Sequence, residues 1–93
     1  NHIESVIMKH PMVEEVCVIR VDHPYKSQVA KAFVVLKSGA REDTVRREIK
    51  KLCLEYLAKY SQPYEIEFRS SLPRTNLGKI DYKQLESEEK EKK

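Results

Sequence analysis

The residues with the clearest chemical potential lie in one polar loop, residues 72 to 80, which reads Leu-Pro-Arg-Thr-Asn-Leu-Gly-Lys-Ile. A connecting loop needs polar residues, but it does not need a glycine followed directly by a lysine. Gly78 gives the backbone freedom and lets a partner approach closely, while Lys79 adds a compact positive charge on a long stem. The pair predicts contact with an anionic ligand. In the alternative interpretation, Gly78 supplies a positive φ at a turn and Lys79 is a solvated surface charge.

The first half of the chain predicts one helix and two strands that help to position this loop. Apolar residues recur at helical spacing over residues 3 to 10, and Pro11 ends that helix. Residues 13 to 21 predict a strand whose continuous β-branched centre, residues 16 to 19, indicates cover on both faces. A second strand is expected over residues 29 to 37. The turn residues between the two strands predict a hairpin with a wide loop.

The second half predicts a long helix, a third strand and a short last helix. Acidic residues suit the start of a helix over residues 42 to 60, and Pro63 follows its end. Its expected apolar face consists of Val45, Ile49, Leu52, Cys53, Tyr56, Leu57 and Tyr60. Strict alternation over residues 64 to 69 predicts a strand with one buried face. Asp81 and Gln84 have the spacing of a capping box that opens the last helix.

These elements predict an α+β fold with a small three-stranded sheet and helices packed on it. The chain has 93 residues, of which 40% are hydrophobic and 35% charged, so one modest core is expected. We expect residues 1–85 to form the domain and residues 86–93, which contain no apolar side chain, to form a charged tail or frayed helix. A three-stranded layer cannot enclose a substrate, so any site must lie at its edge.

Composition excludes several kinds of site. The only glycines are Gly39 and Gly78, so neither a Walker A loop nor a dinucleotide-binding glycine motif is present. Cys17 and Cys53 lie within apolar runs, and the three histidines are scattered, so we expect core thiols with no metal site and no disulfide. No apolar stretch is long enough to span a membrane and nothing resembles a signal peptide, which predicts a cytoplasmic protein. The net charge of +3 does not identify a partner.

Residues 72 to 80 resemble the C-terminal signature of the adenylate-forming enzymes. This superfamily contains acyl- and aryl-CoA synthetases, adenylation domains of nonribosomal peptide synthetases, and luciferases. Three further segments match in the same order along the chain. Residues 10 to 16 match the family's His-Pro-x-Val start of a first strand, residues 32 to 36 match its second strand, and residues 57 to 63 match its Leu-Ala-x-Tyr-x-x-Pro helix end.

The resemblance implies a mobile C-terminal domain that closes over a larger ATP-binding domain of the same polypeptide. That domain, the hinge and most of the Mg²⁺ ligands are expected upstream of Asn1, so the 93 residues alone should be inactive. In this family a carboxylate and ATP form an acyl-adenylate and pyrophosphate, and a thiol such as that of coenzyme A then takes the acyl group. By resemblance, Lys79 is the catalytic lysine of the first step, and Gly78, Arg74 and Thr75 contact the substrate or nucleotide. In the alternative interpretation, Arg74 is a solvated charge and Thr75 stabilises the turn.

Two branches of the family and one other class of protein remain as interpretations. Pro-Arg-Thr followed by Gly-Lys-Ile resembles fatty-acid CoA ligases, which we favour, whereas residues 81 to 85 resemble peptide synthetases. The other class is a small basic RNA-binding module, although the chain offers no Gly-x-x-Gly loop before Lys79 and no exposed aromatic pair is expected on the sheet. We therefore expect no nucleic-acid partner.

Three basic residues near the hairpin are candidates for contact with coenzyme A. After the mobile C-terminal domain, or lid, rotates between the two steps, the phosphates could contact Arg20, Lys26 and Lys31. Alternatively, these three residues form a solvated face. Ser27 departs from the family, because many relatives have glycine where the chain turns toward the second strand. This departure argues against a close approach of coenzyme A to the backbone at that point.

Overall fold

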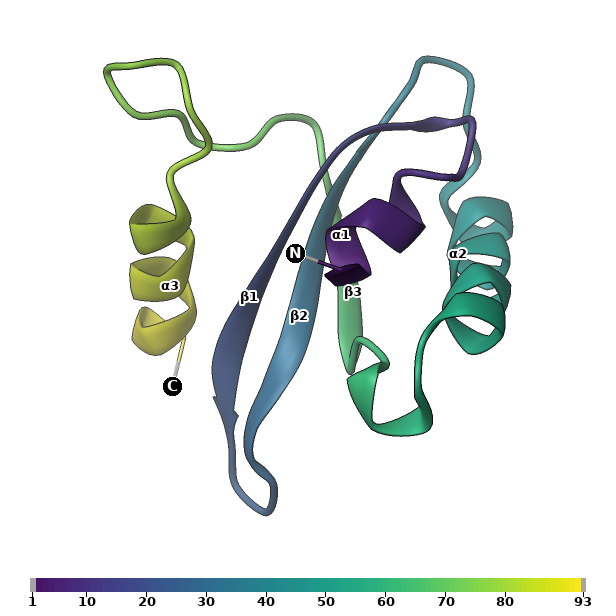
Figure 1. The fold of residues 1–93 in the computed structure, drawn as a ribbon. Helices are drawn as coiled ribbons and strands as arrows, with labels where there is room; N and C mark the ends of the chain where they lie inside the picture. Colours follow the sequence, from purple (N-terminus) through teal and green to yellow (C-terminus); the bar gives the residue numbers. More distant parts are fainter. Residues whose placement is uncertain (1, 93) are drawn as a thin grey trace.

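A computed structural model describes residues 2–92 as one mixed sheet with helices on both faces (Figure 1). The elements are α1 (His2–Ile7), β1 (Val13–His23), β2 (Ser27–Leu36), α2 (Glu42–Tyr56), the 3₁₀ turn η1 (Lys59–Ser61), β3 (Glu65–Arg69) and α3 (Tyr82–Glu91). β1 pairs antiparallel with β2, and β2 pairs parallel with β3 after the α2 crossover. The predicted α+β class and the predicted order of elements are confirmed.

The two faces of the sheet belong to two separate hydrophobic clusters. Val16, Val18 and their partners on β2 and β3 pack against α1 and α2. Cys17, Ile19 and Phe33 point the other way and pack with Leu85 of α3. Figure 1 shows α3 on one side of the sheet and the other two helices opposite. The prediction that the first strand is covered on both sides is confirmed, and the sheet offers no open face for stacking bases within residues 2–92.

The hairpin between β1 and β2 is tighter than the sequence suggests. Strand pairing continues to His23 and Ser27, so only residues 24 to 26 form the loop, and the expected wide loop is wrong. The ring Nδ1 of His23 accepts hydrogen bonds from the backbone N–H groups of Tyr25 and Lys26, both at 3.1 Å. Ser27 then adopts φ 65°, the left-handed region that favours glycine.

Replacing Ser27 with glycine should stabilise the fold. A side chain in the left-handed region costs roughly 1 to 2 kcal/mol, and glycine removes most of that cost at the price of a more flexible unfolded chain. We expect Ser27→Gly to raise the free energy of unfolding by about 1 kcal/mol in urea denaturation. Gly39→Ser is the matched reverse change, because Gly39 has φ 88° and open space at its Cβ position. It should lower stability by a similar amount, and a loss of stability in Ser27→Gly would contradict the argument.

The long helix α2 ends earlier than its apolar spacing predicts. It stops at Tyr56, where Leu57 takes an extended conformation. The amide Nε2 of Gln62 donates to the backbone oxygens of Cys53, Leu57 and Ala58 at 2.9, 3.2 and 3.2 Å. Because Gln62 satisfies these carbonyl groups, residues 57–63 can leave the helix. Tyr56 and Tyr60 are therefore 50% and 93% exposed, and their assignment to the buried face is wrong.

The C-terminal segment is packed more fully than its composition suggests. Half of the predicted capping box is confirmed, since Oδ1 of Asp81 accepts from the backbone N–H of Gln84 at 3.0 Å. The reciprocal bond is replaced, because the Gln84 amide donates to Glu88 and the Asp81 N–H donates to the backbone oxygen of Pro73. However, α3 continues to Glu91, and its acidic residues reach the sheet. The expectation that packing ends at Leu85 is wrong. The reason is a lysine on β2 that the hydrophobic pattern does not reveal.

Lys31 lies on β2 with its side chain 3% exposed and its ammonium surrounded by carboxylates. These are Glu89 at 2.8 Å, Glu67 at 3.0 Å and Glu65 at 3.4 Å. Arg69 extends the cluster by pairing with Glu67 at 2.9 Å and with Glu88 at 2.8 Å. A buried ammonium needs such partners to offset its lost hydration. We call this group, which ties α3 to β2 and β3, the Lys31 cluster.

Candidate functional site

The loop that carries Lys79 is closed by its own hydrogen bonds. The backbone N–H of Thr75 donates to the oxygen of Lys79 at 2.7 Å, and that of Gly78 donates to the oxygen of Thr75 at 2.9 Å. The hydroxyl of Thr75 accepts from the N–H groups of Leu77 and Lys79, both at 3.3 Å. Gly78 has φ 82°, as expected for a turn glycine. Thr75 thus acts within the loop as a turn stabiliser.

The base of the loop is anchored beside α3. Leu72 is buried in the cluster with Leu85, and the backbone oxygen of Pro73 accepts from the N–H of Asp81 at 2.8 Å. Arg74 and Ile80 form an isolated antiparallel bridge at the neck of the loop. Figure 1 shows the loop projecting beyond one end of the sheet, away from the β1–β2 hairpin. The fold therefore carries the loop as a fixed projection.

Lys79 lies exposed on this projection. Within residues 2–92 its ammonium has no ion-pair partner, unlike that of Lys31. Its neighbour Leu77 is 85% exposed. The loop thus presents the ammonium of Lys79 to solvent on an ordered backbone. An anion can bind such a cation without a further cost of ordering the loop.

Arg74, the other expected ligand-binding cation, is engaged within the chain. Its Nη1 donates to the backbone oxygen of Gly78 at 3.3 Å, and its Nη2 forms an ion pair with Glu15 of β1. Sequence reasoning placed Arg74, Thr75, Gly78 and Lys79 in one site, and the structure brings these four together in one loop. It missed Glu15, which is 59 positions before Arg74 and carries no motif of its own.

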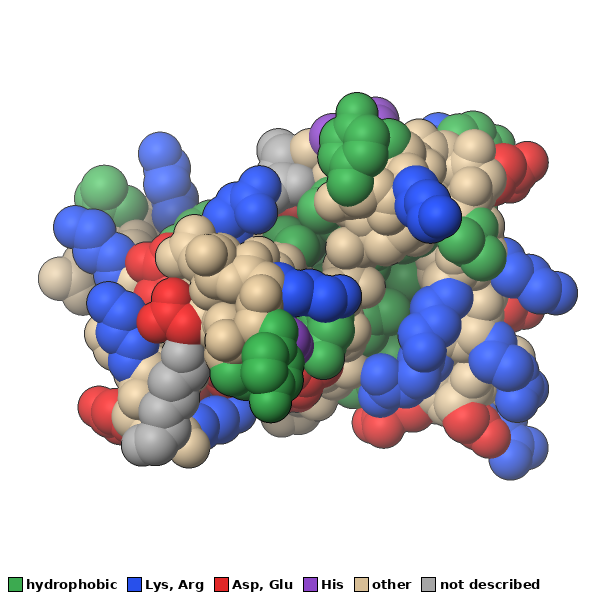
Figure 2. Space-filling view, turned by 90° about the horizontal axis from the view of Figure 1, so that it is seen from below, with side chains coloured by type: hydrophobic (Ala, Val, Ile, Leu, Met, Phe, Trp, Pro, Cys, Tyr) green, Lys and Arg blue, Asp and Glu red, His purple; other side chains and the backbone are tan. Residues whose placement is uncertain are grey.

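A groove lies at the opposite end of the molecule, beside the hairpin. Its volume is about 750 Å³, and its lining includes Arg20, Lys26, Lys59, Tyr60 and Tyr64 but no acidic residue. The ammonium of Lys26 lies 5.2 Å from the ring centre of Tyr64. Figure 2 views this end and shows Lys and Arg side chains spread around exposed hydrophobic ones. Cations beside exposed rings suit a ligand that has both negative charge and an aromatic group.

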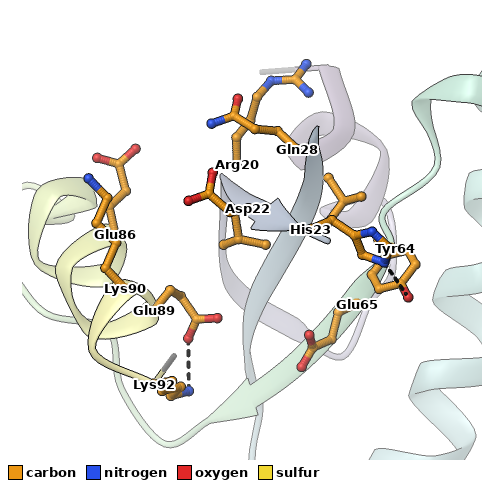
Figure 3. A pocket seen from close by; sticks show the side chains of 12 residues that line it. Arg20, Asp22, His23, Gln28, Tyr64, Glu65, Glu86, Glu89, Lys90 and Lys92 are labelled. Atoms are coloured by element: carbon orange, nitrogen blue, oxygen red, sulfur yellow. Dashed lines mark hydrogen bonds and ion pairs between the residues drawn. The ribbon is translucent and has the colours of Figure 1, made fainter. Parts of the chain in front are cut away.

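A second hollow near the hairpin has mixed charge. It measures about 400 Å³ and lies between the strand ends and α3, where the lining includes Glu65, Glu86, Glu89, Lys90 and Lys92. In Figure 3, Glu89 contacts Lys92, while the guanidinium of Arg20, which also lines this hollow, lies away from both. The acidic residues of this hollow would repel an anionic ligand. The acid-free groove is therefore the better candidate for one.

Lys31 lies in neither hollow. Its ammonium is occupied by the Lys31 cluster, so the expectation that it meets an incoming phosphate or forms a solvated face is wrong. Burial opposes the charge of Lys31, but the hydrogen bonds that its ammonium donates to Glu89 and Glu67 outweigh this and raise the pKa of Lys31 above its usual value. Of the three basic candidates, Arg20 and Lys26 line the groove and remain accessible.

The described residues hold few other reactive groups. Cys17 and Cys53 are buried free thiols, and burial, followed by the charge of Glu4, raises the pKa of Cys17 to about 11. Across residues 2–92, no group of three or more His, Cys, Asp and Glu side chains is arranged to hold a metal. In the same range, no helix combines the length and apolarity needed to cross a bilayer.

Comparison with known proteins identifies close relatives of this chain. Residues 2–79 match the family description "AMP-binding enzyme C-terminal domain". A long-chain-fatty-acid–CoA ligase of Haemophilus influenzae is 42% identical over 89 residues, which are 96% of this chain and 15% of that protein. A long-chain-fatty-acid–CoA ligase of Bacillus subtilis is 39% identical over 91 residues, which are 98% of this chain and 16% of that protein.

Solved structures show the same fold within larger chains. An acyl-CoA synthetase of Brucella canis superposes with a TM-score of 0.88 at 34% identity, over 97% of this chain and 17% of that one. The anthranilate CoA ligase AuaEII, solved with anthranoyl-AMP, gives a TM-score of 0.87 at 35% identity, over 95% and 17% of the two chains. The chain thus spans about 15 to 17% of the relatives it matches.

Proposed function

The chain belongs to the family of AMP-binding enzyme C-terminal domains, and we propose that it serves as the mobile C-terminal domain of an ATP-dependent acyl-CoA synthetase. The acid is proposed to be a fatty acid, because two of the relatives are named long-chain-fatty-acid–CoA ligases. The partner is the larger ATP-binding domain of the same polypeptide. Because Glu88 and Glu89 bind α3 to the sheet, α3 is proposed to move with the mobile C-terminal domain.

One observation carries the proposal: Lys79 extends from an ordered loop with its ammonium unpaired within residues 2–92. When a carboxylate attacks the α-phosphate of ATP, two anions must approach and negative charge builds on the phosphoryl oxygens. A lysine ammonium held in place offsets that charge without a cost of reorganisation. Gly78 gives the loop its turn and adds no side chain next to Lys79. No residue near this loop forms a metal-ligand group, so we assign no Mg²⁺ ligand to the described residues.

The second half-reaction is proposed to use the groove at the other end of the sheet. In coenzyme A, several phosphates and an adenine ring accompany the thiol. We propose that its phosphates form ion pairs with Arg20, Lys26 and Lys59. The adenine ring would stack on Tyr60 or Tyr64. The Lys79 loop and the hairpin lie at opposite ends of the domain (Figure 1). One orientation cannot present both ends to the same cleft, so the lid must rotate between the two steps.

Removing two cations of the groove should weaken the use of coenzyme A alone. We expect Arg20→Ala combined with Lys59→Ala to raise the KM for coenzyme A about tenfold in the full-length enzyme, since each exposed ion pair contributes up to about 1 kcal/mol. Acid-dependent pyrophosphate exchange should stay unchanged, because it needs no thiol. Lys50→Ala on the exposed side of α2 is the control. An unchanged KM for coenzyme A would show that the groove does not bind coenzyme A.

The experiment that tests the proposed function is an assay of products and acceptor. The full-length polypeptide is incubated with ATP and fatty acids, and pyrophosphate, AMP and thioester are measured with coenzyme A or with a phosphopantetheinyl carrier protein. We expect acyl-CoA, with one AMP released per thioester. Activity that requires the carrier protein would support the peptide-synthetase branch instead. No acid-dependent pyrophosphate exchange with any acid, together with salt-sensitive binding of RNA, would contradict the proposal.

A further inference from the structure

A β-bulge lies at the start of β1, close to the Lys79 loop. Val13 pairs with Leu36 and Glu15 pairs with Val35, so Glu14 is an extra residue on β1. Side chains alternate along a strand, so without the bulge Val13 and Glu15 would point to the same face. With it, Val13 packs in the α1–α2 cluster while Glu15 keeps the alternation of Cys17 on the α3 side. The bulge therefore turns a carboxylate toward the face from which the Lys79 loop projects.

Glu15 meets that loop through Arg74. The carboxylate of Glu15 forms an ion pair with Nη2 of Arg74, while Nη1 of the same guanidinium donates to the backbone oxygen of Gly78. Glu15 is about one-quarter exposed, so water screens this pair only in part. The planar guanidinium can hold both partners at once, which a lysine ammonium does less rigidly. A continuous series of contacts thus joins the first strand to the residue directly before Lys79.

We propose that Glu15 is a positioning residue for Lys79, acting through Arg74 on the backbone of Gly78. This inference rests on the proposed function, because it assumes that Lys79 assists adenylate formation. Glu15 orients the guanidinium, the guanidinium fixes the Gly78 carbonyl, and this limits the directions in which the Lys79 side chain can leave the loop. The internal hydrogen bonds of Thr75 shape the loop, whereas the Glu15–Arg74 pair fixes the loop relative to the sheet.

The adenylation step alone should depend on this pair. Loosening the loop reduces the fraction of time that the ammonium occupies its working position, and it leaves the hairpin groove at the other end of the sheet unchanged. The change should therefore appear in kcat for adenylate formation rather than in the KM for ATP. It should not appear in the transfer of the acyl group from preformed adenylate to coenzyme A.

The test uses Glu15→Gln in the full-length enzyme, which removes the charge and keeps the size of the side chain. We expect kcat for acid-dependent pyrophosphate exchange to fall about fivefold, the amount that a partly exposed ion pair supports. The KM for ATP and the thioester step should stay within about twofold. Backbone amides of residues 75–79 should exchange hydrogen about fivefold faster. Glu14→Gln, at the adjacent exposed glutamate, should change none of these quantities.

A double variant shows whether Glu15 acts through Arg74. If it does, Glu15→Gln combined with Arg74→Ala should be no slower than Arg74→Ala alone. Additive losses, an unchanged exchange rate in Glu15→Gln, or equal losses in both half-reactions would overturn the inference. Failure of the proposed function would look different: Lys79→Ala would then leave adenylate formation intact. In that case, hydrogen exchange of the amides of residues 75–79 would still report whether Glu15 holds the loop. Unchanged exchange in Glu15→Gln would show that Glu15 does not restrain the loop.

Discussion

Lys31→Ala is expected to lower the free energy of unfolding by about 3 to 5 kcal/mol, which is the usual cost of removing one partner from a buried ion pair. The side chain of Lys31 is 3% exposed, and three carboxylates converge on its ammonium. Without it, Glu67 and Glu89 would lie close together with much of their charge uncompensated. The contact between α3 and the sheet would weaken first, because Glu89 belongs to α3.

Urea denaturation of Lys31→Ala and of two comparison variants measures this effect. Lys31→Met keeps the apolar stem and removes only the charge, so a similar loss in this variant would assign the effect to the ammonium. Lys37→Ala is the matched control, because Lys37 is the exposed lysine directly after β2, and it should change stability by less than about 0.5 kcal/mol. A loss below about 1 kcal/mol in Lys31→Ala would mean that the cluster does not hold α3 in place.

The same cluster predicts how stability depends on pH. Burial opposes the charges of Glu67 and Glu89, but their bonds to Lys31 and neighbouring cations outweigh it, so their pKa values lie below the usual 4.5. Their contribution is therefore present above pH 4.5 and is lost as the pH falls through the lowered values. The pKa of Lys31 is raised above 10.5, so its contribution is present below pH 10.5 and is lost above it. In Lys31→Ala, the free energy of unfolding should therefore depend less on pH, both at the acidic end and at the basic end.

Hydrophobic periodicity was sufficient to predict the elements of this fold. The two-residue period in β3 and the three- and four-residue spacing in α2 reflect burial of one face of each element, and both elements begin within one residue of the predicted position. The end of α2 was not predictable in this way, because the side chain of Gln62 replaces the missing backbone partners. Likewise, the helix expected over residues 3 to 10 ends at Ile7, so His10 lies beyond it. Its ring instead accepts from the N–H of Met12 at 3.0 Å and bonds Glu48 of α2 at 2.7 Å.

Charge contacts over long sequence separations account for the other differences. Because residues 86–93 contain no apolar side chain, they were expected to form a charged tail or frayed helix, yet Glu89 and Lys31 are 58 positions apart and form one cluster. A lysine in the middle of a strand covered on both faces was the available signal, since such a residue needs nearby carboxylates. At the candidate site, the motif was sufficient to find Lys79 and its loop. Glu15 was missed because a one-residue bulge decides its direction, and no local pattern reveals that bulge.

Lys79→Ala should give the largest change in activity. In the full-length enzyme, we expect adenylate formation to slow by about 100- to 1000-fold, or about 3 kcal/mol of barrier, because one donor to the developing charge is lost. The loop should keep its shape, since its hydrogen bonds involve the backbone of Lys79 and not its ammonium. Lys83→Ala is the matched control, because Lys83 is an exposed lysine four positions further along the chain. It should keep the normal rate.

The most direct measurement compares the two half-reactions of Lys79→Ala in one enzyme preparation. Pyrophosphate exchange reports adenylate formation, and preformed acyl-adenylate with coenzyme A reports thioester formation. The proposed role predicts a loss of at least about 100-fold in the first rate and little change in the second. Pyrophosphate exchange at the normal rate in Lys79→Ala would show that Lys79 does not assist adenylate formation, and it would contradict the central claim.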